Sequence, residues 1–386
     1  MRITHTSESS QGWDNTAPHD CPFATSTEIT GLRRTGNYAA YTKADTWYPS
    51  WGQDDLLYTP FTDGTVFGTA SNSNETGSGQ PATTGHAVIA GSDPLDLQIR
   101  DVGLHHAAAA PYHGRYPSAS LHHDGTWYYG TYCLDDAGRG LNWDVLGPFV
   151  GFRTSTDGGA SWQEGPHTPT DNIFGETALS GEPVRMGAPH FVDFGRNMQH
   201  SPDGYAYLVG HGSRTAGANL SWISGDEITL ARVRPTLETI HDPTQYEWAA
   251  GRNPDGSPRW ATTLSEARPI ASWPGHMGCV TVTYLPVRRK YLMCVTDGWP
   301  TIKEMHSYVL EADQLHGPWR MAAYMDEFGV QGYFLNLPSK FLSADDSRGW
   351  LCYSANFTNS YLDTHWRPDP EGSRYAMCLQ ELILQP

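Results

Sequence analysis

The sequence predicts an all-β fold of the β-propeller type, and three observations lead to this prediction. Aromatic residues make up 12% of the 386 residues and occur in short runs, as they do in strands. The 40 glycines and 27 prolines fall largely between these runs, where turns need them. Few stretches of the sequence show the spacing of apolar residues that is typical of a helix. Although 386 residues exceed the usual length of one domain, all-β propellers reach it as a single domain.

Strand–turn–strand pairs recur along the second half of the chain. They are expected at 206–210 with 228–233, 279–284 with 291–295, 307–311 with 321–325, and 334–341 with 349–355, before a last strand at 375–383. Blades of ~40–50 residues would give about seven to eight blades over this length. Two stacked sheets are the alternative fold. Residues 1–30 are polar and are expected to form an N-terminal arm, followed by one propeller domain at 31–386.

The octet at 155–162 has the spacing of an Asp-box, S-x-D-x-G-x-[ST]-W, a turn between blade strands in sialidase-like propellers. Asp157 is expected to accept hydrogen bonds from backbone N–H groups, and Gly158 and Gly159 to adopt positive φ angles. Trp162 should pack between blades. The octet therefore marks the fold and says little about catalysis.

The chain is acidic, with 42 Asp and Glu against 25 Lys and Arg and a net charge of −17. A surface of that charge repels phosphate backbones, so nucleic acid is not expected as a partner. No apolar run approaches the ~20 residues of a membrane span, and no membrane partner is expected. The N-terminus shows no apolar core of a signal peptide, which leaves the compartment open between the cytoplasm and secretion with a trimmed signal. We expect a monomer.

The six cysteines are scattered along the chain. None has the CxxC spacing of a zinc site. Four lie in apolar runs, so we expect free, buried thiols rather than the disulfide framework of a small secreted domain.

Two of the 17 histidines stand out as candidate catalytic groups. Histidine titrates near neutrality and can act as an acid or a base. His86 is expected to follow a long loop at 69–85 and to open a short strand at 87–90. His106 lies 20 residues further on. His105 is expected to bind substrate, and it could take the place of His106, because neighbours on a strand point to opposite faces.

Five more residues complete this predicted site. Tyr116 is expected to be a catalytic proton donor, and Arg115 and Arg153 to bind a carboxylate, since a guanidinium does so through two hydrogen bonds. His190 and His211, from a histidine-rich stretch, are expected to bind substrate. Such a set could remove a proton next to a carboxylate and protonate a leaving oxygen. The predicted partner is therefore an acidic oligosaccharide or polysaccharide.

A glycoside hydrolase is the alternative, and it would use a pair of carboxylates. Asp54, Asp55, Asp193 and Asp226 are the candidates near expected strand ends. Retaining and inverting enzymes hold the two carboxyls ~5–5.5 Å or ~6.5–9.5 Å apart, a separation that sequence spacing does not give. Motifs of serine hydrolases, zinc proteases, P-loop proteins and dinucleotide-binding proteins are absent from the sequence. A third possibility is a propeller that binds sugar without turning it over.

Several segments of the sequence together resemble a known enzyme family. They are the segments at 45–51, 147–162, 186–212, 219–223 and 338–341. These resemble the L-rhamnose-α-1,4-D-glucuronate lyases, a group of polysaccharide lyases formerly treated as rhamnosidases, and the similarity extends over about residues 40–383. The resemblance implies a seven-bladed β-propeller.

The resemblance also implies an activity and a site. The activity is exo-acting cleavage of terminal L-rhamnose from D-glucuronate by β-elimination, as in arabinogalactan-type polysaccharides. Uronate lyases built on propellers use two histidines about 20 residues apart, which His86 and His106 resemble. No cofactor is expected to be required. A structural ion such as Ca²⁺ is possible by the same resemblance, and its ligands are not predicted.

Overall fold

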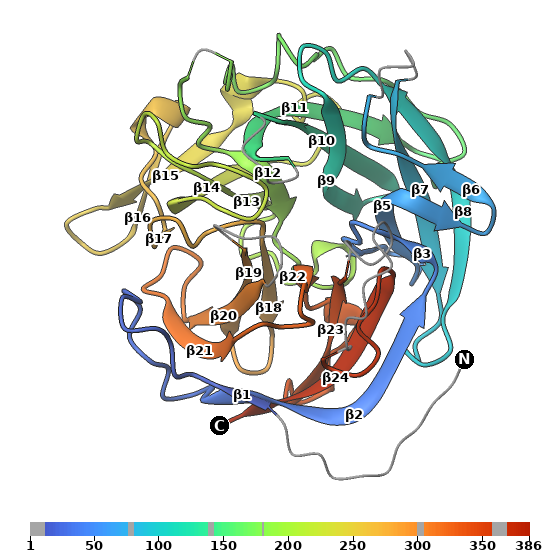
Figure 1. Ribbon diagram of the computed structural model, residues 1–386. Helices are drawn as coiled ribbons and strands as arrows, with labels where there is room; N and C mark the ends of the chain where they lie inside the picture. The colour runs from blue at the N-terminus through green and yellow to red at the C-terminus, as the bar shows by residue number, and fades with distance from the viewer. Residues whose placement is uncertain (1–11, 76–80, 138–142, 180, 299–304, 357–368) are drawn as a thin grey trace.

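The computed structural model describes residues 12–75, 81–137, 143–179, 181–298, 305–356 and 369–386 (Figure 1). In these residues the regular structure consists of strands and four short 3-10 helices, so the predicted all-β class is confirmed. The helices are η1 (Arg196–Met198), η2 (Pro243–Gln245), η3 (Leu264–Glu266) and η4 (Ser339–Phe341). None of the helices in the described part of the chain is long and apolar enough to cross a membrane.

The strands form five antiparallel sheets arranged around a common axis, each sheet being one blade of a β-propeller (Figure 1). Blade 1 comprises β3 (Lys43–Asp45), β4 (Ser50–Trp51), β5 (Leu57–Val66), β6 (Thr69–Ser71), β7 (Ala82–Ala90) and β8 (Gln98–Ala107). Blade 2 comprises β9 (Gly114–His123), β10 (Thr126–Asp135) and β11 (Val145–Ser155).

Three more blades follow in chain order, and the last of them closes the ring. Blade 3 comprises β12 (Gly187–Phe191), β13 (Ala206–Gly212), β14 (Glu227–Val233), β15 (Glu247–Arg252), β16 (Pro258–Ala261) and β17 (Ala271–Ser272). Blade 4 comprises β18 (Val280–Leu285), β19 (Lys290–Asp297), β20 (His306–Ala312) and β21 (Arg320–Met325). Blade 5 comprises β22 (Tyr333–Asn336), β23 (Arg348–Ser354), β24 (Met377–Gln385), β2 (Gly31–Tyr41) and β1 (Gly12–Asp14).

Blade 5 joins the two ends of the chain and closes the ring. β2 pairs antiparallel with β24, from Gly31 opposite Gln385 to Tyr41 opposite Met377. β1 pairs with the outer side of β2, so part of the predicted N-terminal arm is a strand of the propeller. Because strands from both ends of the chain share this sheet, backbone hydrogen bonds hold the two ends of the chain together and close the ring.

The described residues form five blades, so the predicted number of seven is wrong. The physical reason is the size of the blades. A length of ~40–50 residues suits a blade of four strands with short connections, whereas blades 1 and 3 contain six strands each. In addition, two predicted strand pairs, 279–284 with 291–295 and 307–311 with 321–325, are neighbouring pairs within the single blade 4.

The predicted Asp-box is confirmed as a turn after β11. Asp157 accepts hydrogen bonds from the backbone N–H of Ser161 at 2.9 Å and from its hydroxyl at 2.6 Å. Gly158 and Gly159 have φ angles of 68° and 92°, which glycine adopts without strain. The Trp162 ring packs against aromatic rings of β10 and β7 and is half-buried. The turn therefore fastens blade 2 to blade 1.

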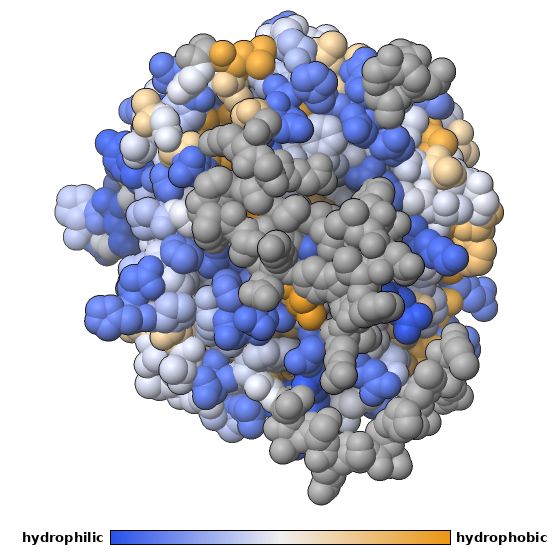
Figure 2. Space-filling model, viewed as in Figure 1, coloured by the Kyte–Doolittle hydropathy of each residue, from blue (hydrophilic) through white to orange (hydrophobic). Residues whose placement is uncertain are grey.

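The state of the cysteines and the polarity of the surface both agree with what the composition predicts. All six cysteines are free, as predicted, and five of them are buried; Cys21 is half-buried. Figure 2 shows a face on which hydrophilic residues cover most of the described surface and apolar residues are scattered. The large apolar side chains that are exposed in the described residues come from separate segments of the chain: Phe67, Leu179, Leu237 and Val287.

Candidate functional site

The axis of the propeller is surrounded by one inner strand from each blade, namely β4, β9, β12, β18 and β22. Neighbouring inner strands run in the same direction, as the parallel bridge between Asp193, after β12, and Thr283, in β18, indicates. Their N-terminal ends therefore gather at one end of the axis. Asp45, Tyr116 and Tyr333 all stand at or shortly before the beginning of an inner strand.

Asp45 is a buried carboxyl at this end of the axis. It ends β3, just before the chain enters β4, and only 6% of its surface is exposed. Its oxygens accept hydrogen bonds from the hydroxyl of Thr46 at 2.9 Å and from the hydroxyl of Tyr333 at 3.0 Å. Burial raises the pKa of Asp45 well above its ordinary value, and the charge of Asp63 raises it further.

Asp63 lies on β5 beside Asp45, because the register pairs Asp45 with Thr62. Its carboxylate accepts hydrogen bonds from the backbone N–H of Ser73 at 2.7 Å and from the Ser73 hydroxyl at 2.6 Å. Burial raises the pKa of Asp63, and hydrogen bonds from Ser73 and Tyr116 oppose that rise. We call Asp45, Asp63, Tyr116 and Tyr333 the axial acid site.

Phenol groups surround the two carboxyls and continue along the axis. Tyr116 contacts Tyr132 and the edge of Trp143, with ring centroids 5.8 Å apart in both pairs. Burial raises the pKa of Tyr48, Tyr116 and Tyr132 well above the ordinary value, and the neighbouring acidic groups add to the rise. These hydroxyls therefore keep their protons near neutrality and can act as hydrogen-bond donors.

Glu176 is a third carboxyl with a raised pKa at the same end of the propeller. Its oxygens accept hydrogen bonds from the backbone N–H groups of Arg185 at 2.7 Å and Met186 at 3.2 Å, the two residues that precede β12. Burial raises the pKa of Glu176 to about 7, against these two hydrogen bonds. A carboxylic acid that titrates near neutrality can donate a proton at physiological pH.

The predicted substrate-binding residues His190 and His211 lie next to the axis, behind the axial acid site. The His190 ring lies 3.7 Å from the Tyr48 ring, and both its nitrogens are buried without a partner in the described residues. His211 Nε2 donates to the carbonyl of Ser221 at 2.8 Å. Burial lowers the pKa of His190 to about 3 and of His211 to about 4, so both rings are neutral near pH 7.

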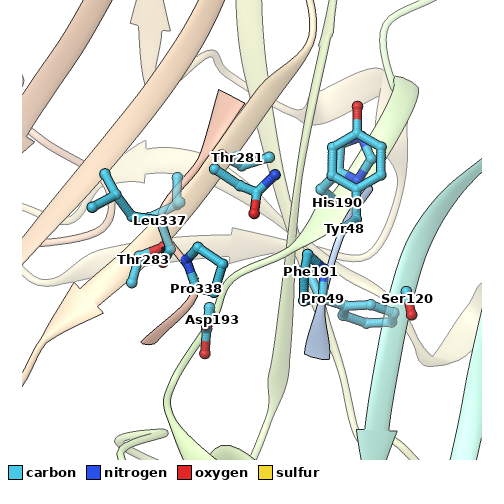
Figure 3. A pocket seen from close by; sticks show the side chains of 12 residues that line it. Tyr48, Pro49, Ser120, His190, Phe191, Asp193, Thr281, Thr283, Leu337 and Pro338 are labelled. Atoms are coloured by element: carbon cyan, nitrogen blue, oxygen red, sulfur yellow. Dashed lines mark hydrogen bonds between the residues drawn. The ribbon is translucent and has the colours of Figure 1, made fainter. Parts of the chain in front are cut away.

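A narrow cavity runs along the axis beside His190 (Figure 3). Residues of all five blades line it, including Tyr48, Ser120, His190, Thr281 and Asn336. Its volume of about 30 Å³ is room for one water molecule and not for a sugar.

The structure brings His86 together with His105 rather than with His106. β7 begins at Ala82, so His86 lies inside a strand, and the expectation that it follows a loop and opens a strand is wrong. The register places His105 opposite Thr84, on the face of the sheet to which His86 points. His106 points to the other face and is exposed.

His86 belongs to a buried group between blades 1 and 2. Its ring has no exposed surface, donates from Nδ1 to the carbonyl of Gly103 at 3.0 Å, and stacks on Trp162 at 4.5 Å. The Arg153 guanidinium lies 4.3 Å from the Trp162 ring on the same side of blade 2. Burial, and then the charge of Arg153, lowers the pKa of His86 well below its ordinary value.

Glu164 forms the outer rim of this group. Its carboxylate pairs with His105 Nε2 at 3.2 Å and with Arg153 Nε at 3.4 Å. Arg115 is buried nearby and donates to the Thr131 hydroxyl and to the Ala108 carbonyl. We call His86, His105, Arg153, Trp162 and Glu164 the histidine–arginine cluster. The catalytic role predicted for His86 and His106, and the binding role predicted for Arg115 and Arg153, stay predictions.

The four aspartates predicted as a hydrolase pair are engaged in local hydrogen bonds. Asp54 accepts from the Tyr58 hydroxyl at 2.6 Å, and Asp55 from the Trp51 indole at 2.8 Å. Asp193 and Asp226 each accept from one hydroxyl and from at least one backbone N–H, which ties loops together. The described residues contain no cluster of three or more histidine, cysteine, aspartate or glutamate side chains that could hold a metal ion, and the Ca²⁺ that the resemblance implies stays a prediction.

Sequence reasoning identified one member of the axial acid site, Tyr116, as a proton donor, and missed its two carboxyls. Asp45 lies in the segment at 45–51, which was singled out only for its resemblance, and Asp63 was not singled out as a candidate. One feature of the sequence could have identified Asp45 as a candidate: it precedes an aromatic run, where a carboxyl would be buried. Nothing in the sequence could pair it with Asp63, because the pairing depends on the register of β3 and β5.

No protein-family model matches the sequence, and no curated protein is significantly similar to it. Solved structures with a related arrangement of the chain include a GH43_1 enzyme from Xanthomonas citri complexed with xylose, with 11% identity over 89% of this chain and 87% of that chain and a TM-score of 0.46. An α-L-arabinofuranosidase from Podospora anserina in complex with cellotriose has 10% identity, coverage of 95% and 96%, and a TM-score of 0.46. An inulosucrase from Halalkalicoccus jeotgali bound to kestose has 13% identity, coverage of 95% and 90%, and a TM-score of 0.45. Similarity at this level assigns neither a substrate nor a role to any residue.

Proposed function

We propose that the protein is a glycoside hydrolase that cleaves its substrate at the axial acid site. The observation that supports this is the register of β3 and β5, which pairs Asp45 with the neighbour of Asp63, together with the pKa values of the two carboxyls, both raised, that of Asp45 partly by the charge of Asp63. The charge of one carboxylate disfavours ionisation of the other, so the pair favours a state in which one of the two carboxyls holds a proton. One protonated and one ionised carboxyl are the two groups that glycoside hydrolysis requires.

The environment of each carboxyl suggests its role. Asp45 lies deeper and retains the proton, which it would donate to the leaving glycosidic oxygen. Asp63 is half-buried and its ionised form accepts hydrogen bonds from Ser73, so it would act as the base or the nucleophile. Glu176, with a pKa of about 7, is a second group able to donate a proton at this end of the propeller.

The predicted lyase reaction on a rhamnosyl-glucuronate end is the competing proposal. It requires a base that reaches the uronate C5 proton and an arginine that neutralises the carboxylate. His86 has no exposed surface, and Arg153 is paired with Glu164 and covered by Trp162. Blades 1 and 2 would have to separate before these groups could meet a substrate. Asp45 is itself only 6% exposed, but Asp63, its partner in the axial acid site, is half-buried, whereas His86 is fully enclosed.

Product analysis separates the two reactions. We would incubate the protein with arabinoxylan, levan and gum arabic, and measure new reducing ends together with the ultraviolet absorbance of an unsaturated uronate. Reducing ends without absorbance are the expected result. Absorbance that grows with the reducing ends would show elimination and overturn the hydrolase proposal. A protein that binds one of these glycans without releasing any product would be the non-catalytic propeller considered as the third possibility.

Activated substrates then identify the proton donor. An aryl glycoside with a good leaving group needs no protonation of its oxygen, so a variant without the donor keeps its activity on that substrate and loses it on the natural polysaccharide. We expect this pattern for Asp45→Asn. If Glu176→Gln shows it and Asp45→Asn does not, Glu176 is the donor. Loss of activity on both substrates is expected for Asp63→Asn.

A further inference from the structure

A large cavity lies between blades 3 and 4, away from the axis, and has a volume of about 370 Å³. This is within the range of small-molecule sites, about 300–1,000 Å³, whereas the axial cavity has only about 30 Å³. We call it the inter-blade groove. It is lined by Asp203, Tyr207, Arg232, Trp260, Tyr291 and His316, among others.

One wall of the inter-blade groove is a face of the blade 3 sheet. The register pairs Tyr207 with Arg232, Arg232 with Glu247, and Ala249 with Trp260, so Tyr207, Arg232 and Trp260 point to the same side. The Arg232 guanidinium lies 4.1 Å from the centroid of the Trp260 ring and holds it against the sheet. Trp260 is half-buried, so part of its ring is open to the groove.

The opposite wall comes from blade 4 and offers polar groups. Tyr291 is the second residue of β19, and Gln314 and His316 follow the end of β20. His316 Nε2 is buried and has no hydrogen-bond partner in the described residues. The Gln314 carbonyl accepts from Arg252 at 3.1 Å, and its NH₂ group makes no hydrogen bond within the described part of the chain. A ligand hydroxyl could satisfy both groups.

The charged groups of the groove are already paired with one another. Asp203 binds Arg232 at 3.0 Å, and Arg232 also binds Glu247 at 2.7 Å. Asp313 binds Lys290 at 2.5 Å. Since Arg232 and Lys290 have carboxylate partners and Arg252 is bonded to carbonyl oxygens of Gly256, Gln314 and Gly317, a uronic acid would have to displace existing bonds and would meet the negative charge of the whole protein. An uncharged ligand is favoured.

We propose that the inter-blade groove is a second carbohydrate-binding site that takes a neutral oligosaccharide. The C–H faces of a sugar ring pack on aromatic rings such as Trp260 and Tyr291, while its hydroxyls bond with His316 and Gln314. Asp203 precedes β13, which is antiparallel to β12, so the groove lies toward the opposite end of the propeller from the axial acid site. The proposal does not depend on the axial acid site being catalytic.

Affinity gel electrophoresis tests the proposal with the full chain. Native gels would contain arabinoxylan, levan or galactan as neutral probes, polygalacturonate as an acidic probe, or no polysaccharide. The variants are Trp260→Ala and His316→Ala in the groove, and Asp45→Asn in the axial acid site. Trp13→Ala is a matched control, because Trp13 is a half-buried tryptophan on strand β1 with the Arg34 guanidinium 5.3 Å from its ring.

We expect at least one neutral polysaccharide to retard the wild-type protein, and Trp260→Ala and His316→Ala to weaken that binding by about tenfold or more, as loss of a central contact does. Trp13→Ala and Asp45→Asn should be retarded as strongly as the wild type. Retardation by no neutral probe, retardation by polygalacturonate alone, or unchanged retardation of Trp260→Ala and His316→Ala would each overturn the proposal. Loss of binding in Asp45→Asn alone would place the ligand at the axial acid site and would also overturn the proposal. Thermal melting verifies that each variant is folded.

Discussion

The axial acid site and the histidine–arginine cluster are both buried groups of titratable residues, and burial acts on them in opposite directions. It raises the pKa of Asp45 and lowers the pKa of His86, because in each case the charged form is the one that loses its water. Burial therefore favours the neutral form of both groups. Only the carboxyl, however, is neutral with a proton that it can donate. Burial alone thus does not identify a catalytic group.

The two regions also differ in how they are built. The axial acid site lies where inner strands begin, at an end of the propeller, and its residues bond mainly with hydroxyl groups. The histidine–arginine cluster lies between two blades, and its members pack on the ring of Trp162. The first arrangement suits a site and the second suits a joint between blades. The predictions that follow test this contrast.

The largest effect is expected at the axial acid site. Asp63→Asn should lower kcat by about 10²–10⁴-fold, which is the usual contribution of a positioned acid or base. The matched control is Asp54→Asn, which removes a carboxylate bonded to Tyr58 at 2.6 Å on the same blade and should retain activity. Initial rates of reducing-end release measure both. Full activity of Asp63→Asn would remove the axial acid site from the mechanism.

A large effect on stability is expected at the joint between blades. Trp162→Ala should reduce the free energy of unfolding by roughly 2–4 kcal/mol, somewhat less than for a fully buried tryptophan because its ring is half-buried. It removes the stacking contacts with His86 and Arg153. Urea unfolding measures the loss. The kcat of the folded fraction should stay at the wild-type value, and a large fall in kcat without loss of stability would give the cluster a catalytic role instead.

How far the sequence predicts the fold depends on the range of the interaction. The Asp-box, the pairing of β13 with β14 and the free cysteines depend on residues close in the chain or on residue type, and they were predicted correctly. The number of blades depends on which strand pairs share a sheet. β18–β19 and β20–β21 have the same strand–turn–strand pattern whether they form two blades or one, so the sequence pattern cannot distinguish seven from five.

A smaller, pH-dependent effect is expected for His190. Its pKa is about 3 in the folded protein and 6.5 ordinarily, so below pH 6.5 the unfolded chain binds a proton that the folded protein does not. Wild-type stability therefore falls as the pH falls from 6.5 toward 3, and this one residue contributes about 1.4 kcal/mol per pH unit.

His190→Phe tests this contribution. The change removes the titrating ring without breaking a hydrogen bond, since both ring nitrogens lack a partner in the described residues. The variant should gain stability relative to the wild type as the pH falls, by about 1.4 kcal/mol per unit, when urea unfolding is compared at several pH values. His211→Phe is a less clean control, because it also loses the bond to Ser221. A difference between His190→Phe and wild type that stays constant with pH would mean that His190 is protonated in the folded protein.

The site was harder to predict than the fold. Histidines are natural candidates for acid–base catalysis because they titrate near neutrality, and the spacing of His86 and His106 suggested a pair. The register, however, places the two side chains on opposite faces of one sheet. Asp45 and Asp63 lie 18 positions apart in the sequence and form no motif. Their pairing depends on where the bulged strand β3 meets β5, which is a property of the folded sheet.

The smallest effect is expected for His106→Ala. His106 is exposed on the outer face of β8, and a surface substitution of this kind usually changes stability by less than about 0.5 kcal/mol. Turnover should also be unchanged, because the side chain points away from His86 and the histidine–arginine cluster.

His86→Ala is the companion variant: it removes a fully buried ring that contacts Trp162 and Tyr129, so it should destabilise the protein while the folded fraction keeps its kcat. A fall in kcat of a hundredfold or more in both variants, with melting temperatures unchanged, would restore the histidine pair as the catalytic groups and contradict the assignment of the axial acid site.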